Sequence, residues 1–279
     1  MQQRSFGSLA CDVSLIGQGT WLIDGGDHAA AADVLRKGLD LGMTHVDTAE
    51  MYGEAELVVA EAIEGRRDEV FLVSKVLPSN ASRTGTVRAC ERSLARLGTD
   101  RLDCYLLHWR GQHPLEETIA GFEELRQAGK IRSWGVSNFD EDDLDEALAI
   151  AGPGAIACNQ VLYHLEERAI EHAVIPWCKK NDVAVVAYSP FGHDRFPGPQ
   201  SRGGRVLQEI AEAHGRSPRQ VALAFLTHGE PLFAIPKASS LPHAADNAAA
   251  GDFELGAEDI RRIDATFPRG RKPRSLPMI

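Results

Sequence analysis

The chain has 279 residues, of which 43% are hydrophobic and 25% are charged, a composition typical of a folded globular protein. Its formal net charge of −10 argues against nucleic acid as a main partner, because binding to a phosphate backbone needs a basic face. No apolar run reaches the roughly 18 residues of a membrane span, no signal-peptide pattern is present, and the cysteines form no CxxC pair. We therefore expect a cytoplasmic protein with no membrane association.

Eight short apolar runs rich in β-branched residues alternate along the chain with longer segments of helical pattern. Most of the runs begin roughly 25 to 35 residues after the previous one, which is the size of a βα unit. A small hairpin is also expected over residues 5–13, where it would plug one end of the fold. The predicted strands are residues 14–19, 45–49, 70–76, 102–109, 131–138, 155–161, 183–188 and 232–237.

The segments between the strands carry helix signals. In residues 86–98, "TVRACERSLARLG", apolar side chains fall on one helical face and a glycine supplies the stop. A similar apolar stripe precedes Gly129. Ser217 has the features of an N-cap, with Pro218 at the first helical position and Gln220 placed to complete a capping box.

Strands that alternate with helices form either a closed parallel barrel or a doubly wound open sheet. The first strand-to-helix turn, "GQGTWLIDGG", does not open a helix with GxGxxG, so the fingerprint of the open sheet fails. We predict an α/β fold, a (β/α)8 TIM barrel with a short N-terminal β-hairpin plug, that spans residues 1–279 as one domain. The Gly/Pro-rich segment 189–204 has the length of a lid. The basic tail 267–279 is expected to be solvated and irregular, and a tail folded over the barrel mouth is the alternative.

Four titratable side chains stand at or just after the ends of three neighbouring strands, where barrel enzymes place their reactive groups. Asp47 ends the second strand and Tyr52 follows it, while Lys75 and His108 end the third and fourth. Each alone has an ordinary role as a cap, a surface cation or a packed residue. Together they indicate acid catalysis: Lys75, held by Asp47, is expected to lower the pKa of Tyr52 so that it donates a proton near neutral pH. His108 would orient a substrate oxygen.

A tyrosine acid beside a polarised oxygen suits the reduction of a carbonyl group, and a cofactor must then bring the hydride. Ser137, Asn138 and Gln160 are suited to hydrogen-bonding a carboxamide, and Tyr188 to stacking on a planar ring. The sequence therefore predicts a site for a redox cofactor beside the four titratable residues.

At this point the chain resembles the aldo-keto reductase superfamily over nearly its whole length. The resemblance implies an NAD(P)H-dependent carbonyl reductase on a (β/α)8 barrel, with Asp47, Tyr52, Lys75 and His108 as catalytic residues and no metal. The order and spacing of nine stretches carry it: "GQGTW", "HVDTAEMYG", "VFLVSKV", "LDCYLLHW", "AGKIRSWGVSNF", "CNQVLYH", "VAYSPFG", "AIPKAS" and "DN" at 246–247.

For the substrate, the chain is most similar to bacterial reductases of small 2-oxoaldehydes such as methylglyoxal, through "YLLHWRG" and "NQVLYHL". Trp21 and Trp109 are expected to wall the pocket for a small-molecule carbonyl substrate. The resemblance also implies a monomer, and a segment 189–204 that closes over the cofactor pyrophosphate. The expected cofactor-binding residues are Gly19, Thr20, Asp47, Ser137, Asn138, Gln160, Tyr188, Ser189, Pro190, Phe191, Lys237, His243 and Asn247.

Two positions depart from the family pattern. Many members carry a Ser or Thr directly after the position of Lys237 and an Arg six positions beyond it, and these groups grip the 2′-phosphate of NADPH. This chain has Ala238, which cannot hydrogen-bond through its side chain, and His243, which is only partly charged at pH 7. We therefore expect NADPH as the cofactor, with NADH as the alternative and a weakened preference between them.

Three other interpretations stay open at this point. A metal-dependent hydrolase on the same fold would use His45, Asp47 and His108 as ligands. A Schiff-base lyase would use Lys75, which must then be a neutral amine. A non-catalytic barrel that senses a cofactor within a larger assembly is the third.

Overall fold

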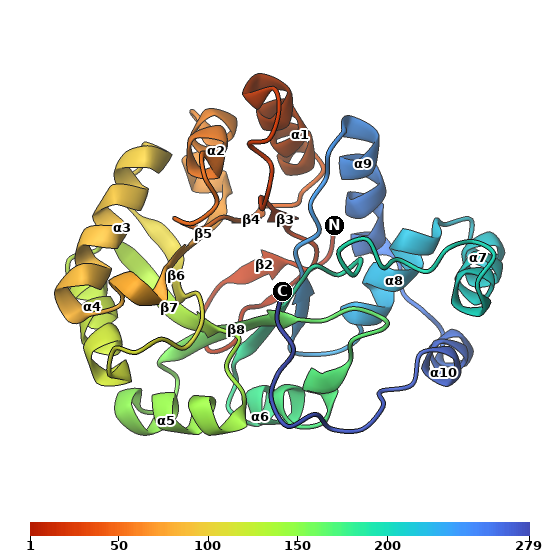
Figure 1. Cartoon of the computed structure of the whole chain (residues 1–279). Helices are drawn as coiled ribbons and strands as arrows, with labels where there is room; N and C mark the ends of the chain where they lie inside the picture. The colour runs from red at the N-terminus through yellow and green to blue at the C-terminus, as the bar shows by residue number, and fades with distance from the viewer.

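The computed structural model describes residues 1–279, and its centre is a sheet of eight parallel strands with helices around the outside (Figure 1). The main chain of Ala234, in the last strand, accepts a hydrogen bond from Gly17 at 2.8 Å and donates one to Leu15 at 3.0 Å. These bonds join the last strand to the first and close the barrel. In order around the sheet the strands are β10 (Leu232–Ala234), β9 (Ala184–Tyr188), β8 (Ile156–Leu162), β7 (Ile131–Ser137), β6 (Leu102–Leu107), β5 (Phe71–Val76), β4 (His45–Asp47) and β3 (Gln18–Gly19).

The predicted barrel is confirmed: seven of the strands lie inside the expected ranges, and β8 runs one residue past its range. Two helices lie outside the alternating plan: α7, between the seventh strand and its own barrel helix, and α10, after the last. The helix α7 occupies part of the long segment between the predicted strands 183–188 and 232–237. The helices are α1 (His28–Asp40), α2 (Ala55–Ile63), α3 (Arg83–Leu97), α4 (Leu115–Gln127), α5 (Glu141–Ala151), α6 (Val174–Lys180), α7 (Arg202–His214), α8 (Pro218–Leu226), α9 (Leu241–Ala249) and α10 (Ala257–Thr266).

Local sequence signals set several helix ends. The helix α3 stops at Gly98, whose φ of 61° is left-handed and costs glycine little. The capping box predicted for α8 is present, because the Ser217 hydroxyl accepts from the Gln220 main chain and the Gln220 side chain accepts from the Ser217 N–H. These caps fix the first turn of α8, which borders the cavity described below.

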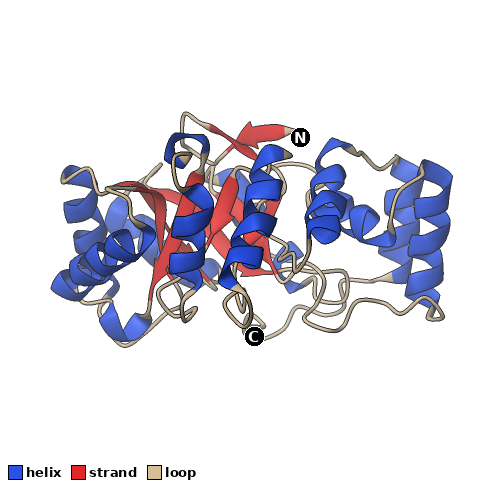
Figure 2. Cartoon of the chain, turned by 90° about the horizontal axis from the view of Figure 1, so that it is seen from above, coloured by secondary structure: helices blue, strands red, loops and turns tan.

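The predicted N-terminal hairpin closes one end of the barrel. It consists of β1 (Gln3–Ser5) paired antiparallel with β2 (Asp12–Ser14). Its turn carries Phe6, which is fully buried against the rings of His45, Phe71 and Phe233, and Cys11, the one exposed cysteine of the chain. Figure 2 shows the hairpin at one end of the barrel and the C-terminus at the other.

The C-terminal tail has no helix or strand and is mostly exposed, as expected, but its last residues also lie over the open end of the barrel, which was the alternative. The buried Arg168 donates to the main-chain oxygen of Phe267 at 2.6 Å and so directs the chain as it leaves α10. Met278 and Ile279 then line a cavity at the barrel mouth. The tail stays in place through contacts distant in sequence, which a reading of local pattern does not capture.

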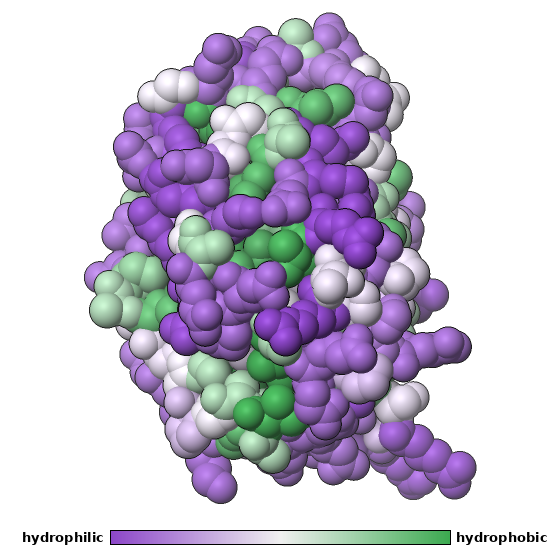
Figure 3. Space-filling model, turned by 90° about the vertical axis from the view of Figure 1, so that its left-hand side faces the viewer, coloured by the Kyte–Doolittle hydropathy of each residue, from purple (hydrophilic) through white to green (hydrophobic).

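The outer surface of the barrel is polar. Figure 3 shows the side on which α3 and α4 lie, where hydrophilic residues dominate and apolar ones appear in small separate areas. This is the pattern of helices that turn one apolar stripe to the sheet and the opposite face to water. None of the helices combines the length and apolar character needed to cross a lipid bilayer.

Candidate active site

The four titratable residues singled out in the sequence meet at the mouth of the barrel. The Lys75 ammonium donates to Asp47 Oδ1 at 2.5 Å and to the main-chain oxygen of Thr48 at 2.8 Å. It also lies 4.9 Å from the centre of the Tyr52 ring. The Tyr52 hydroxyl is 3.4 Å from Nε2 of His108. The strands β4, β5 and β6 are neighbours in the sheet, and this order brings together side chains that lie up to 61 residues apart.

Asp47 holds two partners at once. One carboxylate oxygen accepts from Lys75, and the other accepts from the Gln160 amide at 2.8 Å. Burial opposes the charge of Lys75, but Asp47 and Tyr52 outweigh it and raise the lysine pKa. The amine is therefore a fixed cation at neutral pH, which does not suit the neutral nucleophile of a Schiff-base lyase.

The pKa of Tyr52 differs from the expectation. Burial raises it above the ordinary 10.0, and the ammonium of Lys75 lowers it only in part. The predicted net direction was wrong because the site removes water from the phenol by more than the lysine compensates. A phenol with a raised pKa is fully protonated at neutral pH, which is the form that a general acid needs at the start of a reduction.

His108 is neutral in this setting. Burial, reinforced by the charge of Lys75, lowers its pKa to about 2. Its Nε2 faces Tyr52, while Nδ1 is buried without a hydrogen-bond partner. A neutral imidazole with Nε2 protonated presents one N–H donor to the mouth, where a carbonyl oxygen can accept it.

The polar side chains of the later strands form a connected network. The Asn138 amide donates to the main-chain oxygen of His108 and to the Ser137 hydroxyl, both at 3.2 Å. The Tyr188 hydroxyl donates to Asn138 Oδ1 at 2.9 Å, and burial raises the pKa of Tyr188 to about 12. These bonds fix the side chains in place before any ligand arrives.

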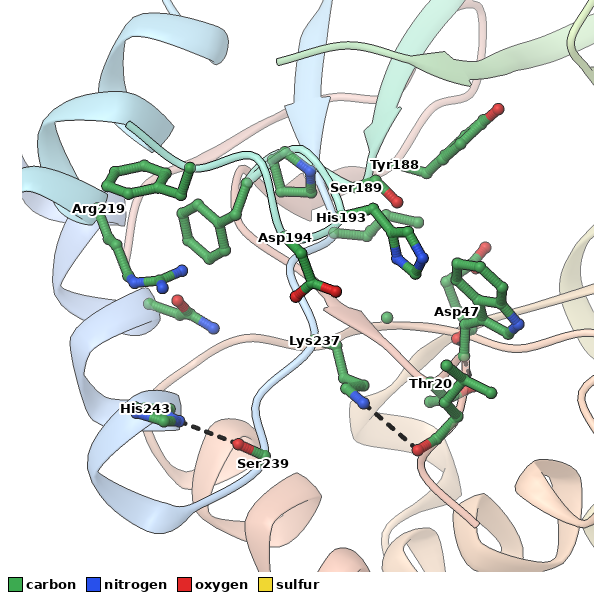
Figure 4. A pocket seen from close by; sticks show the side chains of 18 of the residues that line it. Thr20, Asp47, Tyr188, Ser189, His193, Asp194, Arg219, Lys237, Ser239 and His243 are labelled. Carbon is green, nitrogen blue, oxygen red and sulfur yellow. Dashed lines mark hydrogen bonds between the residues drawn. The ribbon is translucent and has the colours of Figure 1, made fainter. Parts of the chain in front are cut away.

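A groove of about 590 Å³ runs from these residues toward α8 and α9 (Figure 4), within the ~300 to 1,000 Å³ typical of ligand sites. Its walls include every expected cofactor residue except Ser137 and Asn138, which line a second cavity. At Gly19 an added Cβ would lie 2.7 Å from the main-chain oxygen of Ile235, so only glycine fits there. Trp21 and Tyr52, which were expected at the substrate site and in catalysis, also line the groove. The groove residues that were not predicted from the sequence to bind the cofactor are Leu22, His193, Asp194, Phe196, Arg219, Ile235, Ser239 and Asp246.

The far end of the groove holds the departures from the family pattern. Lys237 donates to the main-chain oxygen of Leu22 at 3.3 Å, and the Ser239 hydroxyl lies 3.1 Å from Nδ1 of His243 (Figure 4). Ser240 caps α9 by accepting from the His243 N–H. A lysine, a hydroxyl and an imidazole are thus available here for an anionic group, in place of the hydroxyl and guanidinium expected from the family.

The second cavity, of about 290 Å³, opens beside Tyr52 and His108. Trp21 and Trp109, the predicted substrate residues, both line it. It carries no charged side chain, since His108 is neutral. Its walls are Trp21, Met51, Tyr52, His108, Trp109, Ser137, Asn138, Gln160, Tyr188, Met278 and Ile279.

His45 does not take part in a metal site. Its ring packs edge-on against Phe6 at 5.8 Å and Phe71 at 5.5 Å, on the hairpin side of the barrel. Both ring nitrogens are buried without partners, and burial lowers the pKa to about 4. No three His, Cys, Asp or Glu side chains come together as metal ligands, so the arrangement required by the hydrolase hypothesis does not form.

A protein-family model for the Aldo/keto reductase family matches residues 15–267. The chain belongs to the aldo/keto reductase family. Among curated relatives of this reductase, methylglyoxal reductase YeaE of Escherichia coli (strain K12) is 44% identical over 285 residues, which cover 100% of each chain. Glyoxal reductase of Bacillus subtilis (strain 168) is 34% identical over 252 residues, which cover 89% of this chain and 87% of the relative.

The solved structures agree with the fold described above. A crystal structure of an aldo/keto reductase from Klebsiella pneumoniae, in complex with NADP and acetate, superposes with a TM-score of 0.92 at 42% identity. The match covers 99% of each chain. The family expected from the sequence is therefore confirmed, and with it an oxidoreductase that acts on carbonyl compounds.

Proposed function

We propose that this aldo/keto reductase uses NADPH to reduce small aldehydes and 2-oxoaldehydes, with Tyr52 as the general acid. The observation that carries the proposal is that the groove and the apolar cavity share Tyr52 and Tyr188, so a cofactor in one meets a substrate in the other. The NADP complex of the Klebsiella relative supports the cofactor. The methylglyoxal and glyoxal reductases among the relatives support the substrate class.

NADPH bound in the groove supplies the hydride. His108 donates from Nε2 to the substrate oxygen and orients that oxygen toward the Tyr52 hydroxyl, which lies 3.4 Å from Nε2. The Tyr52 hydroxyl then gives its proton to the oxygen as negative charge develops there. The ammonium of Lys75 stabilises the phenolate that remains, and Asp47 keeps that ammonium charged and in place. Solvent returns the proton to Tyr52 after the product leaves.

The network around Asn138 positions the nicotinamide. Ser137 and Gln160 keep hydrogen-bonding capacity for its carboxamide, and the ring of Tyr188 faces both cavities. At the other end, Lys237 attracts the 2′-phosphate, and Ser239 with His243 completes the contact. Because Ala238 contributes no hydrogen bond, NADPH is preferred over NADH by less than in members with the full set.

The substrate cavity favours small neutral carbonyl compounds. It is only half the size of the groove, and its tryptophan, methionine and isoleucine side chains cover an apolar ligand. A substrate carboxylate would enter without a counter-ion, at a large desolvation cost. All proposed residues come from one chain, and we propose a single-domain monomer as the working form.

The decisive experiment follows the loss of reduced-nicotinamide absorbance with methylglyoxal, glyoxal and pyruvate. We expect turnover of the two aldehydes and little of the 2-oxo acid. Replacing Tyr52→Phe should lower kcat at least about 10²-fold, the low end of what a general acid contributes. A Tyr52→Phe enzyme that retains its rate would show that another group donates the proton.

A further inference from the structure

Arg219 projects from the first turn of α8 into the groove (Figure 4). Its guanidinium carbon lies 4.7 Å from the centre of the Phe191 ring and 4.8 Å from that of Phe196. The two rings are nearly perpendicular, at 87°, with centres 5.7 Å apart. Both belong to the irregular segment between β9 and α7, residues 189–201. The arginine therefore packs against a loop that itself forms part of the groove wall.

No hydrogen bond or ion pair to Arg219 forms in the structure, although acidic residues line the same groove. Asp246 is already engaged, because its two oxygens accept from the Ser217 hydroxyl at 3.0 Å and the Gln220 amide at 2.7 Å. These bonds fix the first turn of α8 and so the direction in which Arg219 leaves it. The phenyl rings cover part of the guanidinium, and the remainder faces the groove.

We propose that Arg219 binds the adenine ring of the cofactor and that this contact fixes the 189–201 loop, whose Phe191 and Phe196 rings Arg219 already contacts. A planar guanidinium stacks on aromatic rings, and a lysine ammonium has no such plane. Arg219 and His243 lie at one end of the groove, and Asp47 lies at the other (Figure 4). With the nicotinamide at Tyr52, the adenine lies toward the end of the groove that holds Arg219 and His243. The inference rests on the proposed placement of NADPH in this groove.

The contact is assigned to the base, not to the 2′-phosphate, because of where the other polar groups lie. Lys237, Ser239 and His243 follow one another along the segment from β10 into α9, whereas Arg219 comes from α8 and stands across the groove from Ser239 (Figure 4). If the 2′-phosphate binds at the β10–α9 segment, the adenine lies between that segment and Arg219 of α8. Arg219 therefore contributes equally to NADPH and NADH.

Equilibrium binding tests the assignment without turnover. Quenching of tryptophan fluorescence would give Kd for NADPH, NADH, adenosine 2′,5′-bisphosphate and 5′-AMP. For Arg219→Ala we expect Kd to rise about tenfold for all four ligands, a typical loss for a stacked base. Arg219→Lys should not restore affinity. Rescue by lysine, an unchanged Kd, or a loss confined to the ligands with a 2′-phosphate would each overturn the proposal.

A second readout follows the loop directly. Arg195 is exposed within the loop, so trypsin can reach it, and saturating NADPH should slow that cleavage in the wild-type protein. In Arg219→Ala at saturating NADPH we expect protection to be lost. Equal protection in both proteins would overturn the coupling between base and loop.

Arg216 provides the matched control. It lies three residues earlier, with its guanidinium 5.3 Å from the Phe253 ring and a bond to the main-chain oxygen of Ala249, outside the groove. Arg216→Ala should leave all four Kd values unchanged. A wild-type protein that binds neither NADPH nor NADH would contradict the proposed function, whereas normal wild-type binding with an unaffected Arg219→Ala variant contradicts only this inference.

Discussion

The two ends of the barrel bury polar groups in opposite ways, and the strand β4 contributes to both. His45 points toward the hairpin end, where it lies among phenyl rings with neither nitrogen bonded. Asp47, two residues later, lies at the mouth and has a partner on each oxygen. The hairpin end is stabilised by packing, so the imidazole of His45 is tolerated there only in its neutral form. The mouth keeps full charges because each is paired.

The contrast predicts that a substitution at the mouth lowers both the stability of the protein and its catalytic rate. Lys75→Met leaves the Asp47 carboxylate buried and unpaired, and removal of one partner of such a pair costs about 3 to 5 kcal/mol. We expect this loss in the free energy of unfolding by urea denaturation, together with a fall in kcat of at least about 10²-fold. The double variant Asp47→Asn/Lys75→Met should regain stability but not activity. A double variant that fails to regain stability would mean that the pair is not the main structural constraint there.

A substitution at the hairpin end should lower stability alone. Phe6→Ala removes a fully buried ring and leaves a cavity, which costs about 3 kcal/mol in well-packed cores. The barrel mouth is at the opposite end, so kcat and KM at 25 °C should stay within about twofold of wild type, as expected for distant independent sites. A large change in kcat would show that the two ends are not independent.

The unpartnered His45 predicts a pH dependence with a definite sign. Its folded pKa, about 4, lies below the ordinary 6.5, so the unfolded chain binds the proton more readily between these values. Stability should therefore be full above pH 6.5 and fall as pH drops toward 4. Between pH 7 and 4.5 this residue accounts for about 2 kcal/mol, at about 1.36 kcal/mol per pKa unit. His45→Leu should remove that part of the pH dependence in urea titrations. If the variant and the wild type show the same pH profile, the dependence belongs to another group, such as His108.

The smallest expected effect concerns the distal end of the groove. His243→Arg replaces an imidazole with a guanidinium, a permanent cation that can bind phosphate through two parallel hydrogen bonds. We expect the ratio of kcat/KM for NADPH to that for NADH to rise about tenfold, or about 1.4 kcal/mol. Ala238→Ser should raise it less. A wild-type enzyme that already prefers NADH strongly would contradict the phosphate contacts proposed for Lys237 and Ser239.

Strand ends and helix caps were predictable because they follow from local rules. Asp47, Lys75 and His108 had to meet once three consecutive parallel strands were recognised, and the Ser217 capping box needs only four residues of sequence. The pKa direction of Tyr52 was not predictable in the same way. It depends on how completely the surrounding loops and tail exclude water, which is a property of the assembled mouth.

Long-range contacts account for the remaining differences. Arg168, about a hundred residues earlier, binds the main-chain oxygen of Phe267, where the tail leaves α10, and so directs the tail toward the mouth. Arg219 stood inside a clear capping motif, and that motif explained its neighbours without indicating where its own side chain would go. Such placements depend on which surfaces the closed barrel brings together, and no periodicity in the sequence encodes them.

The single accessible thiol of this chain offers a practical consequence. Cys11 is exposed on the hairpin turn while the other four cysteines are buried, so a maleimide dye added to the native protein should attach at one defined point. Because desolvation by the surrounding chain and the nearby carboxylate of Asp103 raise the pKa of Cys11, mildly alkaline buffer favours the coupling. The dye would lie at the end of the barrel opposite the tryptophans of the mouth. It could be used to immobilise or track single molecules without blocking the barrel mouth.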